Sequence, residues 1–316
     1  MTSQFQKFMN DVEKEHFHII YAQVRKDGEI VDDWARFPAK PRFESYSTSK
    51  TFVAAGVGIA IDEGLITLDE RVSDSFKAES YDVTNPFALD ITVRDMLTMT
   101  TGTSKPLFFR DSSERAHCKD WIRYFYEKGE FVRAPGTEFL YNNVNPYMLG
   151  ALVEKKSGQN LHEYLRYRLF EPLGIPNPDW TICPKGHTVG GNGMAINVDE
   201  MGRFGQMLLN GGEFNGKRIL SADYVKDMLS SHVSLTPETI PGHPDLPMHY
   251  GYQIWVDPVH NCQFLWGIFG QYCIIMPDKG VVITIQALQD DDGGSNGNYN
   301  VSPLRMKIWE DLVTQY

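Results

Sequence analysis

The sequence lacks the excess of basic over acidic residues that many proteins have when they bind nucleic acids or membrane surfaces. Its 316 residues include 30 Lys and Arg against 41 Asp and Glu, which gives a formal net charge of -11. Because polyanions are bound through clustered basic residues, we expect neither nucleic acid nor a membrane surface among the partners. No run of about 18 apolar residues occurs either, so we expect no membrane-spanning helix.

Cysteine is scarce, and no two of the four cysteines form a Cys-x-x-Cys pair. They are Cys118, Cys183, Cys262 and Cys273. Neither a zinc ribbon nor a dithiol redox motif is therefore indicated. His16 and His18 alternate on one expected strand, but no third ligand stands at metal-binding spacing. We expect no metal and no organic cofactor.

A signal-peptide pattern is also missing, because the first residues have no basic segment followed by an apolar one. We therefore expect a cytoplasmic protein, although a periplasmic or secreted protein from which a leader had been removed would read the same. What is present is an ordinary globular composition, with 42% hydrophobic and 22% charged residues. A chain of this kind folds as one large domain or as two closely packed ones.

Residues 51–63 predict a buried helix, because their apolar side chains cover most of the helix circumference. Gly64 suits the residue that ends such a helix, and Ser47 or a residue just before it suits the cap at its start. Ser47 would lie on the first turn, with Lys50 three residues on and on the same face. Burial lowers the pKa of a lysine, so Lys50 could take the proton of the Ser47 hydroxyl. The N–H groups of the helix start favour a developing oxyanion.

A Ser-x-x-Lys pattern is weak by itself, and a polar helix cap with a solvated lysine is the common alternative. Ser47-x-x-Lys50 is nevertheless the only such pattern in the chain, and Tyr141-Asn142-Asn143 is the only Tyr-x-Asn. A rival Gly-x-Ser-x-Gly pattern contains Ser295. It requires an acid and then a histidine later in the chain, and no histidine follows His260.

The order of the expected elements predicts an α+β fold, in which helices flank an antiparallel β-sheet and a mostly helical segment is inserted. Lys26-Asp27-Gly28 separates two stretches rich in β-formers, which is typical of a hairpin. Late in the chain, strands with short connections favour antiparallel pairing. Those strands are expected at residues 250–256, 262–269, 272–276 and 281–287.

Loops and helices fill the rest of the chain. Residues 232–249 read as a surface loop, 289–300 as a polar loop and 301–316 as a terminal helix. Thr92-Val93-Arg94-Asp95 resembles a capping box that opens a helix. The expected helices of the middle region are 92–102, 112–128, 145–158, a helix capped by Asn160, 197–210 and 221–231.

This order also suggests a division into two domains. We expect residues 1–72 and 240–316 to form one α/β sheet domain from both chain ends, and residues 73–239 to form a mostly helical domain. The active site would lie between the two domains.

The motifs around Ser47 and Tyr141, together with 266–271 and several longer stretches, resemble the serine β-lactamase and penicillin-binding protein superfamily. The similarity is greatest to its class C-like branch, which includes family VIII carboxylesterases, D-aminopeptidase-like proteins and nylon-oligomer hydrolases. It covers nearly the whole chain. The stretches that carry it are 46–50, 58–64, 96–102, 135–137, 170–174 and 202–212.

The resemblance implies a role for each matching residue. Ser47 would be the acylated nucleophile and Lys50 its base. Tyr141 would relay the proton to the leaving group and help to activate water, and Asn143 would orient both the substrate and Lys50. The backbone N–H of Ile268 would join that of Ser47 in an oxyanion hole.

One motif departs from the pattern of the resembling proteins. A Lys-Thr-Gly or His-x-Gly is usual where this chain has Trp266-Gly267-Ile268. The cation that would bind a substrate carboxylate is thus missing from this strand, and Trp266 offers an aromatic face and an indole N–H instead. Gly267 would let the strand come close to the reacting carbonyl. We expect these three residues and Asn143 to bind the substrate.

The sequence therefore predicts a serine hydrolase, an esterase or amidase that works through an acyl-enzyme. Its partner would be a small-molecule ester, amide or lactam. Two alternatives stay open, namely a β-lactamase or D-Ala-type peptidase proper, and a non-catalytic binding or scaffold protein of the same fold. The natural substrate and the oligomeric state also stay open.

Overall fold

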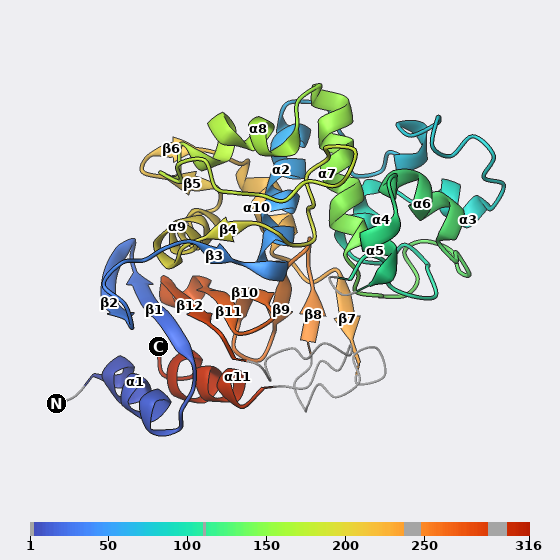
Figure 1. Cartoon of the computed structure of the whole chain (residues 1–316). Coiled ribbons are helices and arrows are strands. Elements are labelled where there is room, and N and C mark those ends of the chain that lie inside the picture. Colours follow the sequence, from blue (N-terminus) through green and yellow to red (C-terminus); the bar gives the residue numbers. More distant parts are fainter. Residues whose placement is uncertain (1–2, 110–111, 237–247, 290–301) are drawn as a thin grey trace.

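The centre of the molecule is an eight-stranded sheet in the order β2-β1-β12-β11-β10-β9-β8-β7 (Figure 1). The structure is a computed structural model that describes residues 3–109, 112–236, 248–289 and 302–316. All neighbouring strands of the sheet run antiparallel. The strands are β1 Ile19–Lys26, β2 Glu29–Ala35, β7 Val233–Leu235, β8 Met248–Tyr250, β9 Trp255–Asp257, β10 Cys262–Gly267, β11 Gln271–Met276 and β12 Val281–Ala287.

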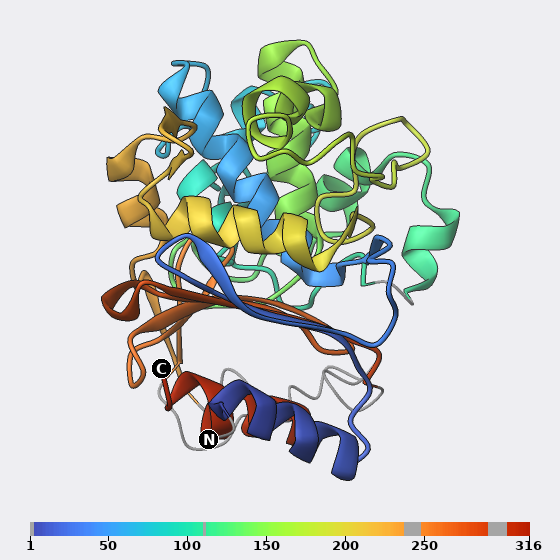
Figure 2. The same cartoon turned by 90° about the vertical axis from the view of Figure 1, so that its left-hand side faces the viewer.

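Helices cover both faces of this sheet, which makes three layers. Figure 2 shows α1 (Gln4–Lys14) and α11 (Pro303–Ile308) side by side on one face, and α2 (Ser49–Asp62) and α9 (Val198–Leu209) on the other. A π-helical turn, Trp309–Val313, continues α11. The remaining helices are α3 Pro86–Leu89, α4 Val93–Leu97, α5 Ser113–His117, α6 Trp121–Lys128, α7 Val144–Ser157, α8 Leu161–Leu165 and α10 Ala222–Met228.

Two short strand pairs lie outside the main sheet. They are β3 Phe43–Glu44 with β4 Ala195–Ile196, and β5 Glu213–Phe214 with β6 Lys217–Arg218. The β3–β4 pair ties the segment before α2 to the segment before α9. None of the helices in the described residues is both long and apolar enough to cross a lipid bilayer.

Helix α2 is the buried helix that the apolar run predicts. Every residue from Ser49 to Ala60 is buried. The helix packs against α7, α8 and α10 as well as the turn before it. Gly58 allows α10 to approach closely, because a Cβ there would lie 2.2 Å from the Tyr224 ring. The Tyr224 hydroxyl then reaches the α2 backbone and donates to the Ala54 carbonyl at 2.7 Å.

The α+β fold and the antiparallel sheet are confirmed, and so are the hairpin at Lys26-Asp27-Gly28 and the capping box at Thr92. The division at residues 72 and 240 stays a prediction, although β7 already belongs to the sheet. The predicted loop at 232–249 is wrong where it is described, because β7 and the start of β8 pair there. The 289–300 loop and the Ser295 pattern lie outside the described residues, apart from position 289.

Three predicted elements are shorter or split. The strand at 250–256 is really the end of β8 and the start of β9, because the chain turns between them and Gln253 takes a left-handed φ of 55°. The helix at 112–128 is two helices, because the Asp120 side chain caps a new start by accepting from Arg123 N–H. The helix at 92–102 ends at Leu97, since Met99 has a φ of 61°.

The close approach at Gly58 predicts a sharp contrast between two glycines of α2. Gly58→Ala should lower the free energy of unfolding by about 1–3 kcal/mol, because the methyl group would overlap the Tyr224 ring. Gly56→Ala should be near neutral, since its nearest neighbour is the flexible end of Leu165 at 3.2 Å and alanine favours the helix. Urea denaturation of both variants measures this. Equal stabilities would show that Tyr224 does not pack on Gly58 as described.

Candidate active site

Ser47 lies in a single 3₁₀ turn, Tyr46–Thr48, that leads directly into α2. The turn is closed at its base, because Thr48 donates to the Ser45 carbonyl through both its N–H and its hydroxyl, at 3.2 and 3.0 Å. Ser45, just before Ser47, is the N-cap residue of this turn, and neither the turn nor α2 has a side-chain capping bond. The half-buried Ser47 hydroxyl is thus directed to another partner.

That partner is Lys50, whose side chain is 1% exposed. Its Nζ lies 2.9 Å from Ser47 Oγ, 2.7 Å from Asn143 Oδ1 and 2.7 Å from the Gly191 carbonyl oxygen. Two of these three neighbours are acceptors only. A neutral amine can donate its two N–H bonds to them and keep its lone pair for the Ser47 hydroxyl.

The surroundings of Lys50 favour that neutral form. Burial is the larger cause and the positive charge of Arg115 the smaller, and together they hold the pKa of the Lys50 amine well below its usual value. Arg115 belongs to α5, where its guanidinium lies 5.6 Å from the centre of the Trp121 ring. The arrangement therefore provides a serine hydroxyl next to an amine that can accept its proton.

Asn143 is held in position by the backbone of a neighbouring segment. Its Nδ2 donates to the Phe108 carbonyl at 3.0 Å, and its own N–H donates to the Leu107 carbonyl at 3.3 Å. Because the amide nitrogen faces a carbonyl, the amide oxygen must face Lys50. Asn142 stabilises the same segment, since its Oδ1 accepts a hydrogen bond from the Asn145 N–H at 2.9 Å. That bond holds the first turn of α7, which begins at Val144, one residue before the expected start at 145.

The Tyr141 ring lies next to the Lys50 amine. Lys50 Nζ lies 4.9 Å from the centre of the Tyr141 ring, and this ring stacks on Trp255 at 5.5 Å. Trp255 in turn meets Trp266 edge to face at 5.7 Å. The Trp266 indole is 7% exposed and lies under the Arg305 guanidinium, which is 5.3 Å from its ring centre. Trp266 therefore belongs to a buried aromatic cluster behind Tyr141, and its contact with substrate stays a prediction.

The end of strand β10 passes close to the turn that carries Ser47. A Cβ at Gly267 would lie 2.4 Å from the Ser45 carbonyl oxygen, so only glycine fits there. Ile268 follows at once and is half-buried. Tyr46 and Phe269, the neighbours of Ser47 and Ile268, both have left-handed φ values, 51° and 67°. Their rings touch edge to face at 5.0 Å, which joins the turn to the strand end.

The structure thus brings Ser47, Lys50, Tyr141 and Asn143 together, with Gly267 and Ile268 beside them. Sequence reasoning missed the Gly191 carbonyl and the Arg115 charge. The run Gly190-Gly191-Asn192-Gly193 was a usable signal for the first, because repeated glycine marks close backbone approach. A Cβ at Gly191 would indeed lie 2.9 Å from Asn143 Cβ. Within the described residues, no group of three His, Cys, Asp or Glu could hold a metal ion.

Comparison with known proteins places this chain in a class. The family model "Beta-lactamase" matches residues 5–300, so the chain belongs to the Beta-lactamase family. It is 32% identical over 142 residues to the beta-lactamase of Escherichia coli (strain K12), an alignment that covers 45% of this chain and 35% of that protein. The alignments with curated relatives cover between 29% and 54% of the relatives' own length.

Solved structures share the fold over almost the full chain. A family VIII carboxylesterase superposes with a TM-score of 0.75 at 19% identity, covering 98% of this chain and 96% of the other. A Bacillus anthracis protein assigned as a 6-aminohexanoate-dimer hydrolase gives 0.76 at 18% identity, covering 96% and 80%. At such identities the likeness shows the fold, and the resemblance to this superfamily that the sequence motifs indicated is confirmed.

The environment of Lys50 predicts how stability depends on pH. Because the pKa of Lys50 is lowered on folding while an unfolded lysine has a pKa of about 10.4, the unfolded chain holds this proton over the intervening pH range. At pH values below the folded-state pKa of Lys50, burial of this lysine lowers the free energy of unfolding by its full amount. This penalty shrinks as pH rises from that pKa toward about 10.4. Relative to Lys50→Met, the wild type should gain up to about 1.4 kcal/mol per pH unit in that window.

Urea denaturation of both proteins from neutral to alkaline pH measures the difference. Lys155→Met, a substitution at an exposed position on α7, is the control and should leave the pH dependence unchanged. A constant difference between wild type and Lys50→Met would contradict a neutral, buried amine.

Proposed function

We propose that this protein is a serine hydrolase that cleaves small to medium-sized esters or amides through an acyl-enzyme. The observation that carries the proposal is the contact of the buried Lys50 amine with Ser47 Oγ on one side and with two carbonyl oxygens on the other. A serine next to a neutral amine is an activated nucleophile. Membership of the Beta-lactamase family supports the same reading.

In the first step Ser47 Oγ attacks the substrate carbonyl carbon while its proton passes to Lys50 Nζ. The carbonyl oxygen becomes an oxyanion, which the backbone N–H groups of Ser47 and Ile268 would stabilise. Gly267 supports this placement, because its missing side chain lets the strand end approach the Ser45 carbonyl. The bond to the leaving group then breaks, and the leaving alcohol or amine takes up the proton.

We take Tyr141 as the candidate that passes this proton on. Its ring borders Lys50 Nζ, so its hydroxyl is a candidate to pass the proton from the ammonium to the leaving group. In the second step a water molecule would give up a proton to the same residues and attack the ester of Ser47. Hydrolysis releases the acid and restores the Ser47 hydroxyl. No metal or organic cofactor is needed in this sequence.

A second feature concerns the acyl group that the site accepts. We propose that neutral acyl groups are preferred over carboxylate-bearing ones, because β10 has Trp266 where a lysine or histidine is usual and so lacks that cation. Arg115 on α5 argues against this preference, because its positive charge acts on Lys50 and could also attract a substrate carboxylate. A β-lactamase or D-Ala-type peptidase proper would use such a cation, and a scaffold protein would not turn substrate over at all.

Replacing the nucleophile tests the proposal directly. Ser47→Ala should fold as the wild type does and lose at least about 10³-fold in kcat on a p-nitrophenyl ester, because covalent catalysis is removed while binding remains. It should also resist labelling by a fluorophosphonate probe that acylates the wild type. Ser295→Ala is the matched control and should keep its activity. Activity near that of wild type in Ser47→Ala would refute the assignment, and an unlabelled, inactive wild type would favour the scaffold.

The acyl preference is tested with two chromogenic substrates. Since nitrocefin carries a carboxylate and p-nitrophenyl butyrate does not, the wild type should have at least about tenfold higher kcat/KM for the ester. A lysine at position 266 would lie beside Arg305 and risk misfolding, so the substrate pair is the cleaner test. Faster hydrolysis of nitrocefin would contradict the preference. A selective loss of that activity in Arg115→Gln would then identify α5 as the source of the carboxylate-binding charge.

A further inference from the structure

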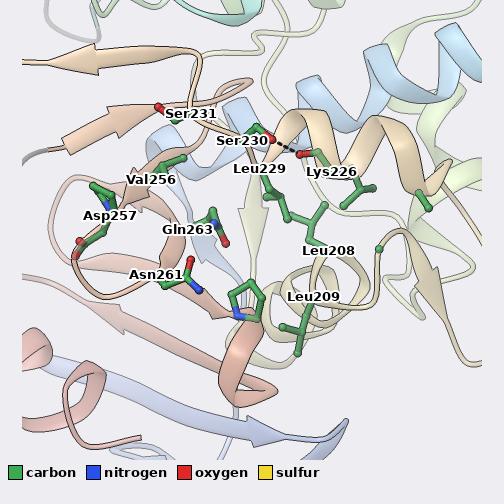
Figure 3. A pocket seen from close by; sticks show the side chains of 15 residues that line it. Leu208, Leu209, Lys226, Leu229, Ser230, Ser231, Val256, Asp257, Asn261 and Gln263 are labelled. Carbon is green, nitrogen blue, oxygen red and sulfur yellow. Dashed lines mark hydrogen bonds between the residues drawn. The ribbon is translucent and has the colours of Figure 1, made fainter.

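A second concave site lies on the same side of the sheet as Ser47, away from the residues described above. It is a groove of about 550 Å³ between α9, α10 and the β9–β10 hairpin (Figure 3). Its walls are mostly apolar. The side chains that define them are Leu208, Leu209, Val225, Leu229, Val256 and Pro258.

One polar group in this groove is not satisfied. Gln263, on β10, is 9% exposed, and its Oε1 is buried without a hydrogen-bond partner among the described residues. Figure 3 shows the Gln263 side chain directed into the groove, toward Leu208 and Leu229. A buried amide oxygen without a partner costs about 1–3 kcal/mol in general, so such a group indicates a missing partner.

The neighbouring polar side chains of the groove are already engaged. Asp257 accepts from the N–H groups of Val259 and His260, from the His260 ring and from the Trp309 indole. Asn261 donates to the Asp278 carboxylate, and the Ser230 hydroxyl donates to the Lys226 carbonyl. Lys226 also lines the groove but is exposed, so Gln263 is the buried side chain of the described lining that keeps bonding capacity.

We propose that the groove binds a small neutral amide with an apolar substituent. A carboxamide offers an acceptor and a donor side by side, and a ligand amide pairs with both in one plane. The leucine, valine and proline walls take up the apolar part, as in most small-molecule sites. A neutral ligand is favoured, because the buried polar group is neutral and the Asp257 carboxylate has its own donors.

The place of Gln263 relates this groove to the reaction site. Gln263 and Gly267 stand at opposite ends of β10, and alternate residues of a strand face the same side. Four residues of strand span roughly 13 Å. The groove is thus a separate site, close enough that an occupant contacts the same strand that passes Ser47.

Two matched probes test the proposal, namely 4-phenylbutanamide and 5-phenyl-2-pentanone, in which a methyl group replaces the amide NH₂. Both are titrated into the full chain carrying Ser47→Ala, so that neither is turned over and the result does not depend on the proposed hydrolysis. Methyl resonances of Leu208, Leu229 and Val256 report on the groove, and the Ile268 methyl groups report on the reaction site. We expect shifts at the three groove residues, with the amide binding about 3- to 10-fold more tightly than the ketone.

Gln263→Leu provides the decisive comparison, because leucine fits the apolar walls and removes only the amide. In this variant the two probes should bind equally well, while methyl resonances remote from the groove stay in place and show that the fold is intact. Equal binding of both probes to the parent chain would overturn amide recognition. Shifts confined to Ile268, or none at the groove residues, would overturn the site itself.

Discussion

The burial of an amine at the start of an apolar helix is the constraint on which the rest of this site depends. An ammonium ion in that place would lose its hydration, so burial lowers the pKa of Lys50 and favours a neutral amine with fixed partners. Those partners come from three separate segments, namely the turn with Ser47, the start of α7 with Asn143 and the glycine-rich segment with Gly191. The desolvation that lowers the free energy of unfolding also favours the neutral amine, which is the form that can accept a proton.

Close backbone approach is the second requirement, and glycine meets it at each crossing. Gly267 lets β10 pass the Ser45 carbonyl, Gly191 lies against Asn143, and Gly58 admits the Tyr224 ring. Between these contacts, Tyr46 and Phe269 hold left-handed backbone angles that only surrounding packing can maintain. The site is therefore kept in place by the whole three-layer fold, which explains why its parts come from both chain ends and the helical middle.

Sequence reasoning succeeded where the signal was local. The all-round apolar pattern after Lys50 predicted a buried helix, the Thr92 capping box predicted a helix start, and Asp27-Gly28 predicted the first hairpin. It failed where a single capping residue or a contact distant in sequence decided the outcome. The split of the 112–128 helix depends on one capping aspartate, and the turn between β8 and β9 depends on Gly251, whose Cβ would lie 2.4 Å from the Met228 carbonyl. The glycine run at 190–193 indicated a close backbone approach but not that Lys50 is its partner, and no local pattern marked Arg115 as the electrostatic neighbour of Lys50.

The charge next to Lys50 bears on how a proton would move through the site. Arg115 disfavours the ammonium form, so the proton that Ser47 gives up would stay on Lys50 only briefly. The nearby Tyr141 ring can stabilise a transient positive charge on Lys50 Nζ through its π face. In the proposed reaction, a Lys50 ammonium that its surroundings disfavour would pass its proton onward to a leaving group. The lowered pKa of Lys50 would then serve both halves of the proposed transfer, since it makes the amine available and favours its return to the neutral state.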